Sequence, residues 1–509
     1  MVRSDGEFKV KVLDLDFGSF RFIIINASDA VERDIKANER VRILKGDRSC
    51  TAHVMISKTI ISKGEVALPK NVADELKVRD GDSVGVRPVL SSKSTLHIKR
   101  KVLGDKLSQE EIRTIIKEVV DGTIGEAEIA SFLTAQYFYG LTHDELEALI
   151  KAMVETGAVI EFEDKAYDEH SIGGVPGNSK VALIVVPTVA AGGLLIPKTS
   201  SRAIVSPSGT ADTMEVLANV EFEPEELKRI ALKTKGTIVW GGALRLAPSD
   251  DIFIRVEHRL MIDPPTQMVA SILAKKLAMN ISTLIIDIPV GKGAKVESMK
   301  EAEALARLFV EQASRLGMRT KCTLSYGGQP IGHCVGPALE AREALEALLT
   351  GEGAMSLIGK ALSIAGLLFE EAGVARRGSG IEIAKQIFYS GKSYDKFKEI
   401  IEAQGGNPHV KPEDIPVGEH RIDIEAPEDS YVTHVDNTAI TLIARVAGAP
   451  LDKGAGVKVY VKAGGKVRKG DKLLTIYAES KSKLSQAYSL AQQLQPVTLE
   501  GMILKVYPE

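Results

Sequence analysis

The sequence predicts a multidomain α/β protein with four parts: an N-terminal β-barrel, a small all-helical lobe, a central α/β lobe with a mixed sheet, and a C-terminal β-rich α+β domain. Three observations support this prediction. Apolar and polar residues alternate near both ends of the 509-residue chain, as in strands with one buried face. Helical periodicity dominates the region from 104 to 165. From about 166 to 420, short apolar runs alternate with amphipathic helices, which is the pattern of a sheet covered by helices.

We place the domain boundaries where these patterns change. The expected domains are a barrel at 1–90, a helical lobe at 104–165 plus about 250–285, an α/β lobe at 166–249 plus 286–420, and a C-terminal domain at 425–509. Within the first domain, the order strand, short helix, tight turn and strand at 67–86 resembles half of a double-psi barrel, a fold used for substrate recognition and assembly. A generic small β-domain is the alternative for this part.

Two capping signals predict helix starts in the helical lobe. Ser108 with Glu111, and Thr142 with Glu145, have capping-box spacing ahead of apolar-periodic runs. The longest apolar run, 181–197, is short for a membrane span and contains an internal proline and two glycines. We therefore expect a buried helix followed by a turn there.

Composition excludes several classes of protein. The net charge of −3 lacks the basic surplus of a general nucleic-acid binder. Three cysteines are too few for a disulfide framework, and the nine histidines show no metal-ligand spacing. The first residues lack the apolar segment of a signal peptide. We expect a cytoplasmic protein without a metal.

The most informative stretch is 198–217, where hydroxyl side chains and two cations precede an apolar-periodic helix. Asp212 and Glu215 have capping-box spacing, so this helix is expected to begin near Asp212. The N–H groups at a helix start carry partial positive charge and attract anions. A second polar, glycine-dense turn lies upstream at 168–180. The pair predicts a phosphate site, whereas one such loop alone fits an ordinary helix cap equally well.

Motifs within and around these turns resemble the thymidine phosphorylase family of nucleoside phosphorylases. The matching segments are Ser200-Ser201-Arg202, Ser208-Gly209-Thr210-Ala211-Asp212 with Glu215, His170-Ser171-x-Gly173-Gly174, Ala270-Ser271 with Lys275-Lys276, Gly291-x-Gly293, Gln329-Pro330-Ile331-Gly332, and Gln404-Gly405-Gly406. The match runs from about 107 to the end, and the first 90 residues lie outside it. The resemblance implies an enzyme that cleaves a glycosidic bond with inorganic phosphate as co-substrate and needs no cofactor.

Departures from the family pattern change the expected substrate. Glu169 stands where the family's pyrimidine enzymes have a phosphate-binding lysine, so the cation must come from elsewhere. The candidates are Lys180, Lys198 and Lys295. Ser201 replaces a glycine, and the arginine that reads the pyrimidine has no clear counterpart. An extra hydroxyl and an extra lysine would suit a second phosphate.

With its added N-terminal β-domain, this pattern most resembles the archaeal branch of the family that acts on AMP. That resemblance implies conversion of a nucleoside 5′-monophosphate (AMP, with CMP and UMP open) into free base and ribose 1,5-bisphosphate. The expected partners are therefore a small-molecule nucleotide and phosphate, with no nucleic acid and no membrane. We expect a homodimer or a larger homo-oligomer.

Asp263 is the candidate catalytic acid. Its apolar neighbours in the sequence should raise the pKa of its carboxyl and keep a proton available for the leaving base. A helix N-cap is the alternative role, since Asp263 precedes two prolines and an apolar helix. The family resemblance favours the proton donor, which for adenine would act on N7.

The remaining predicted site residues bind substrate or phosphate. They are Ser171, Gly174, Lys180, Ser200, Ser201, Arg202, Ala203, Ile204, Val205, Ser206, Thr210, Ser271, Lys275 and Lys295. Ser271 and Lys275 are carried over from the serine and lysine that contact the base in the family, and they lie one helical turn apart. Lys276 is expected to face water, and His170 to shape the pocket rather than act as a base.

Three other functions remain open at this point. Glu169 and the missing arginine count against a pyrimidine nucleoside phosphorylase. An anthranilate-type phosphoribosyltransferase would need acidic residues for magnesium and pyrophosphate, and no such cluster is evident. A binding or assembly protein with an inactive phosphorylase body fits poorly with intact phosphate loops and Asp263.

Overall fold

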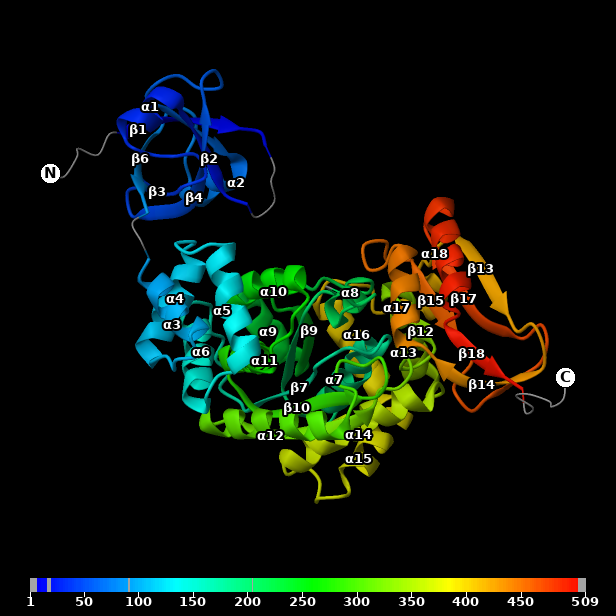
Figure 1. The fold of residues 1–509 in the computed structure, drawn as a ribbon. Coiled ribbons are helices and arrows are strands. Elements are labelled where there is room, and N and C mark those ends of the chain that lie inside the picture. The colour runs from blue at the N-terminus through cyan, green and yellow to red at the C-terminus, as the bar shows by residue number, and fades with distance from the viewer. Residues whose placement is uncertain (1–6, 16–19, 90–91, 204, 502–509) are drawn as a thin grey trace. The chain divides into compact units, whose positions relative to one another are not determined.

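The computed structural model describes residues 7–15, 20–89, 92–203 and 205–501. The chain forms two compact units, one from 1–156 with 248–267 and the other from 157–247 with 268–509. Figure 1 shows the course of the chain through both units. The fold class predicted from the sequence is confirmed, with one difference in the central sheet.

The first unit begins with a closed six-stranded barrel. Its strands are β1 (Glu7–Leu13), β2 (Phe22–Asn26), β3 (Arg40–Lys45), β4 (Arg48–Ser57), β5 (Glu65–Pro69) and β6 (Ser83–Pro88), with the short helices α1 (Ala27–Glu32) and α2 (Lys70–Leu76). The strands close in the order β1-β5-β2-β4-β3-β6. Alternate side chains such as Phe8, Ile23 and Val66 are fully buried inside it, which explains the alternation seen in the sequence.

Helices make up the rest of the first unit. They are α3 (Lys93–Val102), α4 (Gln109–Val120), α5 (Glu126–Tyr139), α6 (His143–Glu155) and α10 (Pro248–Leu260). Both predicted capping boxes are present, because the Ser108 and Thr142 hydroxyls accept the N–H groups of Glu111 and Glu145, and the glutamates bond back to the cap N–H groups.

The second unit contains a small parallel sheet and a strand pair. The sheet has the order β11-β10-β7, formed by β7 (Ala166–Ser171), β10 (Ile281–Val290) and β11 (Arg319–Tyr326); the pair is β8 (Ile196–Ser200) with β9 (Gly236–Trp240). Every pairing among these five strands is parallel. The sheet is therefore parallel where a mixed one was predicted, because each connection passes through a helix. The boundary predicted at 285 falls inside β10.

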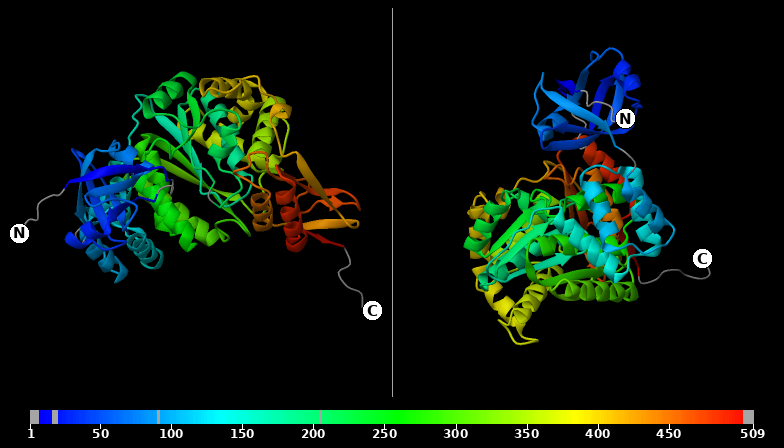
Figure 2. Two further views of the ribbon diagram at one scale, coloured as in Figure 1. Left: turned by 90° about the horizontal axis from the view of Figure 1, so that it is seen from above. Right: turned by 90° about the vertical axis from the view of Figure 1, so that its left-hand side faces the viewer.

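Helices pack around these strands, and Figure 2 gives two views of them. They are α7 (Val181–Ala191), α8 (Thr210–Glu215), α9 (Pro224–Thr234), α11 (Pro265–Ala278), α12 (Met299–Arg315), α13 (Pro337–Thr350), α14 (Met355–Glu371), α15 (Gly380–Tyr389) and α16 (Lys392–Ala403). The predicted buried helix is α7, which is buried from Val181 to Ala190. Among the described helices none is by itself long and apolar enough to cross a membrane, and α13 with α14 meets that test only as a pair bent by 71°.

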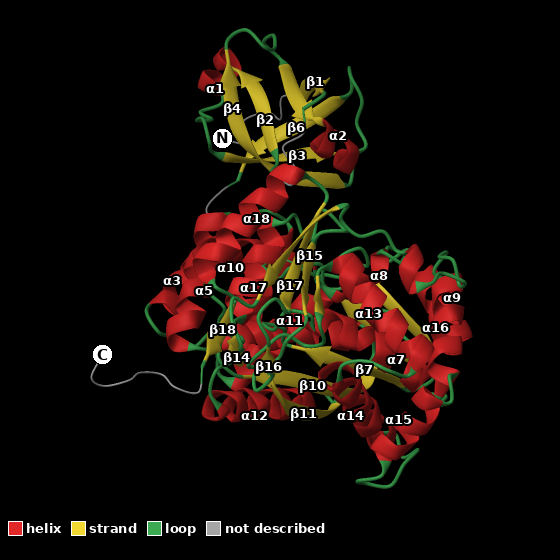
Figure 3. Ribbon diagram, turned by 90° about the vertical axis from the view of Figure 1, so that its right-hand side faces the viewer, coloured by secondary structure: helices red, strands yellow, loops and turns green. Residues whose placement is uncertain are grey.

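The C-terminal part is β-rich, as predicted (Figure 3). Its elements are β13 (His420–Glu425), β14 (Ser430–Val435), α17 (Asn437–Val446), β15 (Gly456–Val459), β16 (Lys466–Val467), β17 (Lys472–Ala478), α18 (Lys481–Leu494) and β18 (Val497–Glu500). Strand β12 (Cys334–Val335), which precedes α13, pairs with β15. This shared sheet joins the C-terminal part to the α/β part.

Candidate active site

The upstream predicted phosphate turn, 168–180, begins inside β7 and ends in the 3-10 turn η1 (Asn178–Lys180). Its part after β7, residues 171–178, is called the first turn because it comes first along the chain. Strand β10 runs parallel to β7, with Ser171 opposite Asp287, and the glycine turn that carries Lys295 follows β10. Both turns therefore leave the sheet at the same edge. In parallel α/β sheets, this is the edge that binds ligands.

Two of the predicted substrate-binding residues, Gly174 and Lys295, are in direct contact. Gly174 has φ +87°, and a Cβ built on it would lie 2.5 Å from Lys295 Cβ and 2.6 Å from the Lys295 nitrogen. No other residue fits this conformation and this space. Gly174 is thus the point at which the turns after β7 and β10 meet.

Beside the first turn, four charged side chains form two buried ion pairs. Lys276 Nζ lies 2.6 Å from Asp168 Oδ2 and donates to the Thr199 carbonyl at 3.1 Å. Lys198 Nζ lies 3.3 Å from Glu169 Oε1 and donates to the Glu169 carbonyl at 2.5 Å. The charge of Glu169 is therefore balanced within the protein, which explains how an acid can occupy a position where the family has a lysine.

The prediction that Lys276 faces water is wrong. The side chain is 1% exposed, because α11 turns it toward β7 and β8 instead of toward solvent. Burial lowers the pKa of Lys276 to about 8, while the Asp168 carboxylate acts in the opposite direction.

The charges of four lysines act on His170. Burial, followed by the charges of Lys276, Lys198, Lys275 and Lys295, holds the pKa of His170 well below its usual range. Its Nδ1 is buried, with no hydrogen-bond partner among the described residues. The imidazole is thus neutral at neutral pH. Two of the lysines that act on it, Lys276 and Lys198, are themselves balanced by Asp168 and Glu169.

Ser271 and Lys275 share one face of α11, as their spacing predicts. Lys275 Nζ donates to Ser271 Oγ at 3.4 Å, and the charge of Lys275 contributes to the lowered pKa of His170.

Lys180 has a different position from these residues. Its ammonium is fully buried, donates to the carbonyls of Ile331 and Cys334 at 2.8 and 2.6 Å, and lies 3.1 Å from Glu343 Oε2. An ammonium has three hydrogens, and all three have protein partners here. Of the three candidate cations for phosphate, Lys295 is the one that packs against the turn itself.

Arg202 anchors the downstream predicted phosphate loop, which lies within 198–217. Its guanidinium makes two hydrogen bonds to Glu215, at 2.7 and 2.6 Å, and a third to Glu221 at 2.8 Å. It also lies 4.7 Å from the centroid of the Trp240 ring. Three of the five N–H groups of the guanidinium therefore have protein partners.

The capping box predicted between Asp212 and Glu215 is wrong. Helix α8 begins two residues earlier, at Thr210, and Asp212 is its third residue. The Asp212 carboxylate accepts the N–H groups of Gly209 at 3.0 Å and Ala203 at 2.7 Å. Those two donors are therefore not available to an anion.

The other loop residues are arranged as follows. Three hydroxyls donate to carbonyls: Ser200 to Val239 at 3.3 Å, Ser206 to Ser208 at 3.3 Å, and Thr210 to Ser179 at 3.1 Å. A hydroxyl has one hydrogen, so each must rotate to donate to a substrate oxygen. Ser201 and Val205 are exposed, and Ile204 lies outside the described residues.

The Glu215 contacts predict an acid-dependent contribution to stability. The hydrogen bonds from Arg202 lower the pKa of Glu215 to about 2. Because this is below the unfolded value of about 4.3, the stabilisation is present above pH 4.3 and is lost as the pH falls toward 2. We expect Glu215→Gln to lower the Tm at pH 7 by about 2 °C, since the pair is partly exposed. In thermal melts the difference should shrink below pH 4, while Glu226→Gln, in an exposed pair, should change nothing at either pH.

Asp263 belongs to the first unit, between α10 and α11, and its side chain is exposed there. The apolar surroundings predicted for it are therefore not found within that unit. It lies two residues before α11, the helix that carries Ser271 and Lys275.

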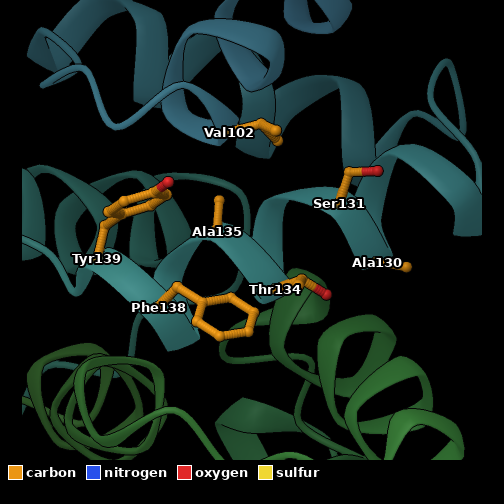
Figure 4. Close-up of a pocket in the computed structure, with 7 residues that line it drawn as sticks. All are labelled: Val102, Ala130, Ser131, Thr134, Ala135, Phe138 and Tyr139. Carbon is orange, nitrogen blue, oxygen red and sulfur yellow. The ribbon is translucent and has the colours of Figure 1, made fainter.

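The first unit contains a hollow of about 350 Å³, and Figure 4 shows the residues that line it. It is lined by Val102, Ala130, Ser131, Thr134, Ala135, Phe138 and Tyr139. The lining contains no carboxylate, lysine, arginine or histidine and none of the predicted site residues. We assign no catalytic role to it.

Sequence reasoning missed two residues beside the first turn, Asp287 and Lys360. They form an ion pair of 2.8 Å between β10 and α14. A usable signal was present for each: Asp287 is a lone carboxylate in an apolar strand, and Lys360 is a lone cation in the apolar helix α14.

Three family models match the chain. A glycosyl transferase family helical bundle domain covers 96–157, a glycosyl transferase family a/b domain covers 163–394, and a pyrimidine nucleoside phosphorylase C-terminal domain covers 431–497. These domains define a pentosyltransferase.

Relatives that match the chain over nearly its whole length identify its family within the pentosyltransferases. AMP phosphorylases of Hyperthermus butylicus, Pyrococcus furiosus and Methanocaldococcus jannaschii are 52%, 50% and 48% identical to the chain, over 98% of its length and at least 98% of theirs. The chain belongs to the AMP phosphorylase family. In structure, it resembles anthranilate phosphoribosyltransferase from Thermus thermophilus, with a TM-score of 0.50 and 19% identity over 60% of this chain and 98% of that one. At that identity, the likeness concerns the fold alone.

Proposed function

We propose that this enzyme catalyses the phosphorolysis of AMP. Inorganic phosphate attacks C1′ of the ribose, the glycosidic bond breaks, and the products are adenine and ribose 1,5-bisphosphate. CMP and UMP, which carry the same 5′-phosphate, are the further candidate substrates. The observation that supports this proposal most is the packing of Gly174 against Lys295, by which the glycine turns after β7 and β10 meet at the carboxyl edge of the sheet.

The chemistry requires a cradle for phosphate and an acid for the base. Positive charge develops on the ribose and negative charge on the departing base, so a positioned acid assists departure. We assign the acid role to Asp263, and the task of holding phosphate oxygens to the turn around Gly174 and to Lys295. Ser271 and Lys275 are assigned to the base region. No cofactor beyond phosphate is needed for these steps, and we propose that the chain works as a homo-oligomer.

Product analysis tests the proposal. AMP, CMP, UMP and adenosine are each incubated with the enzyme with and without inorganic phosphate, and the base and the sugar phosphate are quantified. We expect release of adenine from AMP only with phosphate, in equal amounts with ribose 1,5-bisphosphate. Base release without phosphate would indicate a hydrolase, and a requirement for magnesium and pyrophosphate would indicate a phosphoribosyltransferase.

The contact between Gly174 and Lys295 predicts a large effect of one methyl group. In Gly174→Ala, the new Cβ must displace the Lys295 backbone, and a shift of that size at a reacting centre costs about 10²-fold in rate. Gly173→Ala is the matched control, because Gly173 also has a positive φ (+80°) but nothing lies within 4 Å of its Cβ position. Steady-state kinetics with AMP should show the loss in the first variant only. Equal losses in both would mean that backbone strain, not the displacement of Lys295, limits activity.

A further inference from the structure

We infer that Asp287 and Lys360 are positioning residues that fix the phosphate turn, 171–178, through a buried hydrogen-bond network. The inference rests on the proposed function and deepens it, since it names the groups that hold the turn in place. Neither residue is expected to touch substrate.

Asp287 joins three elements at the edge of the sheet. It is 1% exposed and lies in β10 opposite Ser171, the last residue of β7. Its Oδ2 accepts the Ser171 hydroxyl at 2.8 Å and lies 2.8 Å from Lys360 Nζ. Its Oδ1 accepts the hydroxyls of Ser325 at 2.6 Å and Thr323 at 3.3 Å. Both carboxylate oxygens therefore have donors, which come from β7, β11 and α14.

Lys360 extends this network to the far end of the turn. Its Nζ donates to Asn178 Oδ1 at 2.7 Å, and Asn178 begins the 3-10 turn (η1, Asn178–Lys180) that leads into α7. Asp287 thus holds Ser171 at the start of the turn, while Lys360 holds Asn178 at its end. A charge buried in an apolar helix is costly unless it is paired, and Asp287 is the partner of Lys360. Together the two side chains contact both ends of the first turn.

The network changes the role expected of Ser171. Its single hydroxyl hydrogen goes to Asp287, and its oxygen accepts the Gly173 N–H at 3.3 Å. Ser171 is therefore used to shape the turn, whose Gly173 and Gly174 have φ +80° and +87°. Phosphate would then be held by groups that the turn presents, and not by the Ser171 hydroxyl.

A positional role and a purely electrostatic role predict opposite results for Asp287→Asn. The variant removes a negative charge and leaves Lys360 without its anionic partner. If charge alone mattered, phosphate would bind more tightly. If Asp287 positions the turn, phosphate should bind more weakly, because an amide cannot accept from all four of its donors.

The test compares Asp287→Asn with Glu371→Gln. Glu371 pairs with Lys321 at 2.5 Å and links the same helix to the same sheet, eleven residues farther along α14, or about 16 Å. We expect the KM for phosphate to rise at least about tenfold in Asp287→Asn, with the KM for AMP changed less than about threefold and all values unchanged in Glu371→Gln. An unchanged or lower KM for phosphate overturns the inference, as does a parallel rise of both KM values.

A second variant covers the case in which Asp287→Asn does not fold. Asp287→Asn combined with Lys360→Met leaves the net charge unchanged, so any loss of phosphate affinity is positional; unchanged affinity overturns the inference. Binding is also read from the rise in Tm that inorganic phosphate causes. That readout separates the two proposals: a wild-type enzyme that binds phosphate but releases no base refutes the proposed function, while loss of the Tm rise in the variants still supports the positioning role.

Discussion

Replacing Asp263 by asparagine is expected to leave the fold and the binding of AMP intact and to lower kcat by about 10²–10⁴-fold, the usual contribution of a positioned acid. Asparagine has the shape of aspartic acid but has no acidic proton to give to N7 of the departing adenine. The measurements are kcat in steady state and the Kd for AMP by calorimetry. Asp121→Asn is the control, because Asp121 is an exposed carboxylate at the end of α4 in the same unit.

A methylated substrate makes the test specific for proton donation. In N7-methylated AMP the base already carries a positive charge, so it leaves without a proton. Asp263→Asn should therefore cleave this substrate at close to the wild-type rate, while failing with AMP. Loss of activity toward both substrates would show that Asp263 acts in positioning or closure instead, and an unchanged kcat with AMP would remove it from the mechanism.

Sequence patterns predicted correctly those elements that depend only on interactions between residues close together in the chain. The capping boxes at Ser108 and Thr142 lie within four residues of chain, and the buried helix α7 follows from a long, mostly apolar run. The capping box predicted at Asp212 does not form. The Asp212 carboxylate accepts the N–H of Ala203, in another part of the loop, and the Glu215 carboxylate accepts hydrogen bonds from Arg202. The same spacing thus has a different meaning when a tertiary partner competes for the side chain.

The arrangement of the lysines could not be predicted, because their partners are distant in sequence. Lys276 is 108 residues from Asp168, and Lys180 is 154 residues from Cys334. A lysine in an amphipathic pattern is ordinarily exposed, so nothing local marks Lys276 as buried. The sequence did indicate that Glu169 required a cation from elsewhere. The structure adds that Lys198 neutralises Glu169 itself.

AMP should be preferred to adenosine by several kcal/mol in kcat/KM. Two charge-assisted contacts to the 5′-phosphate, each contributing about 1.5–3 kcal/mol, correspond to about 10²–10⁴-fold. The measurement is kcat/KM for both substrates at saturating inorganic phosphate. Comparable values would instead make the enzyme a nucleoside phosphorylase.

Replacing Lys295 tests whether this residue binds the 5′-phosphate of AMP or the inorganic phosphate. If Lys295 holds the 5′-phosphate, Lys295→Met should lower kcat/KM for AMP by about 10–100-fold and leave adenosine nearly unchanged, because only AMP has the group that it contacts. If Lys295 holds inorganic phosphate, both substrates should lose equally and the KM for phosphate should rise. Lys292→Met is the control, since Lys292 is an exposed lysine in the same glycine turn. Because the backbone of Lys295 packs against Gly174, only a side-chain change isolates its charge, and the pattern across two nucleosides assigns that charge to one phosphate.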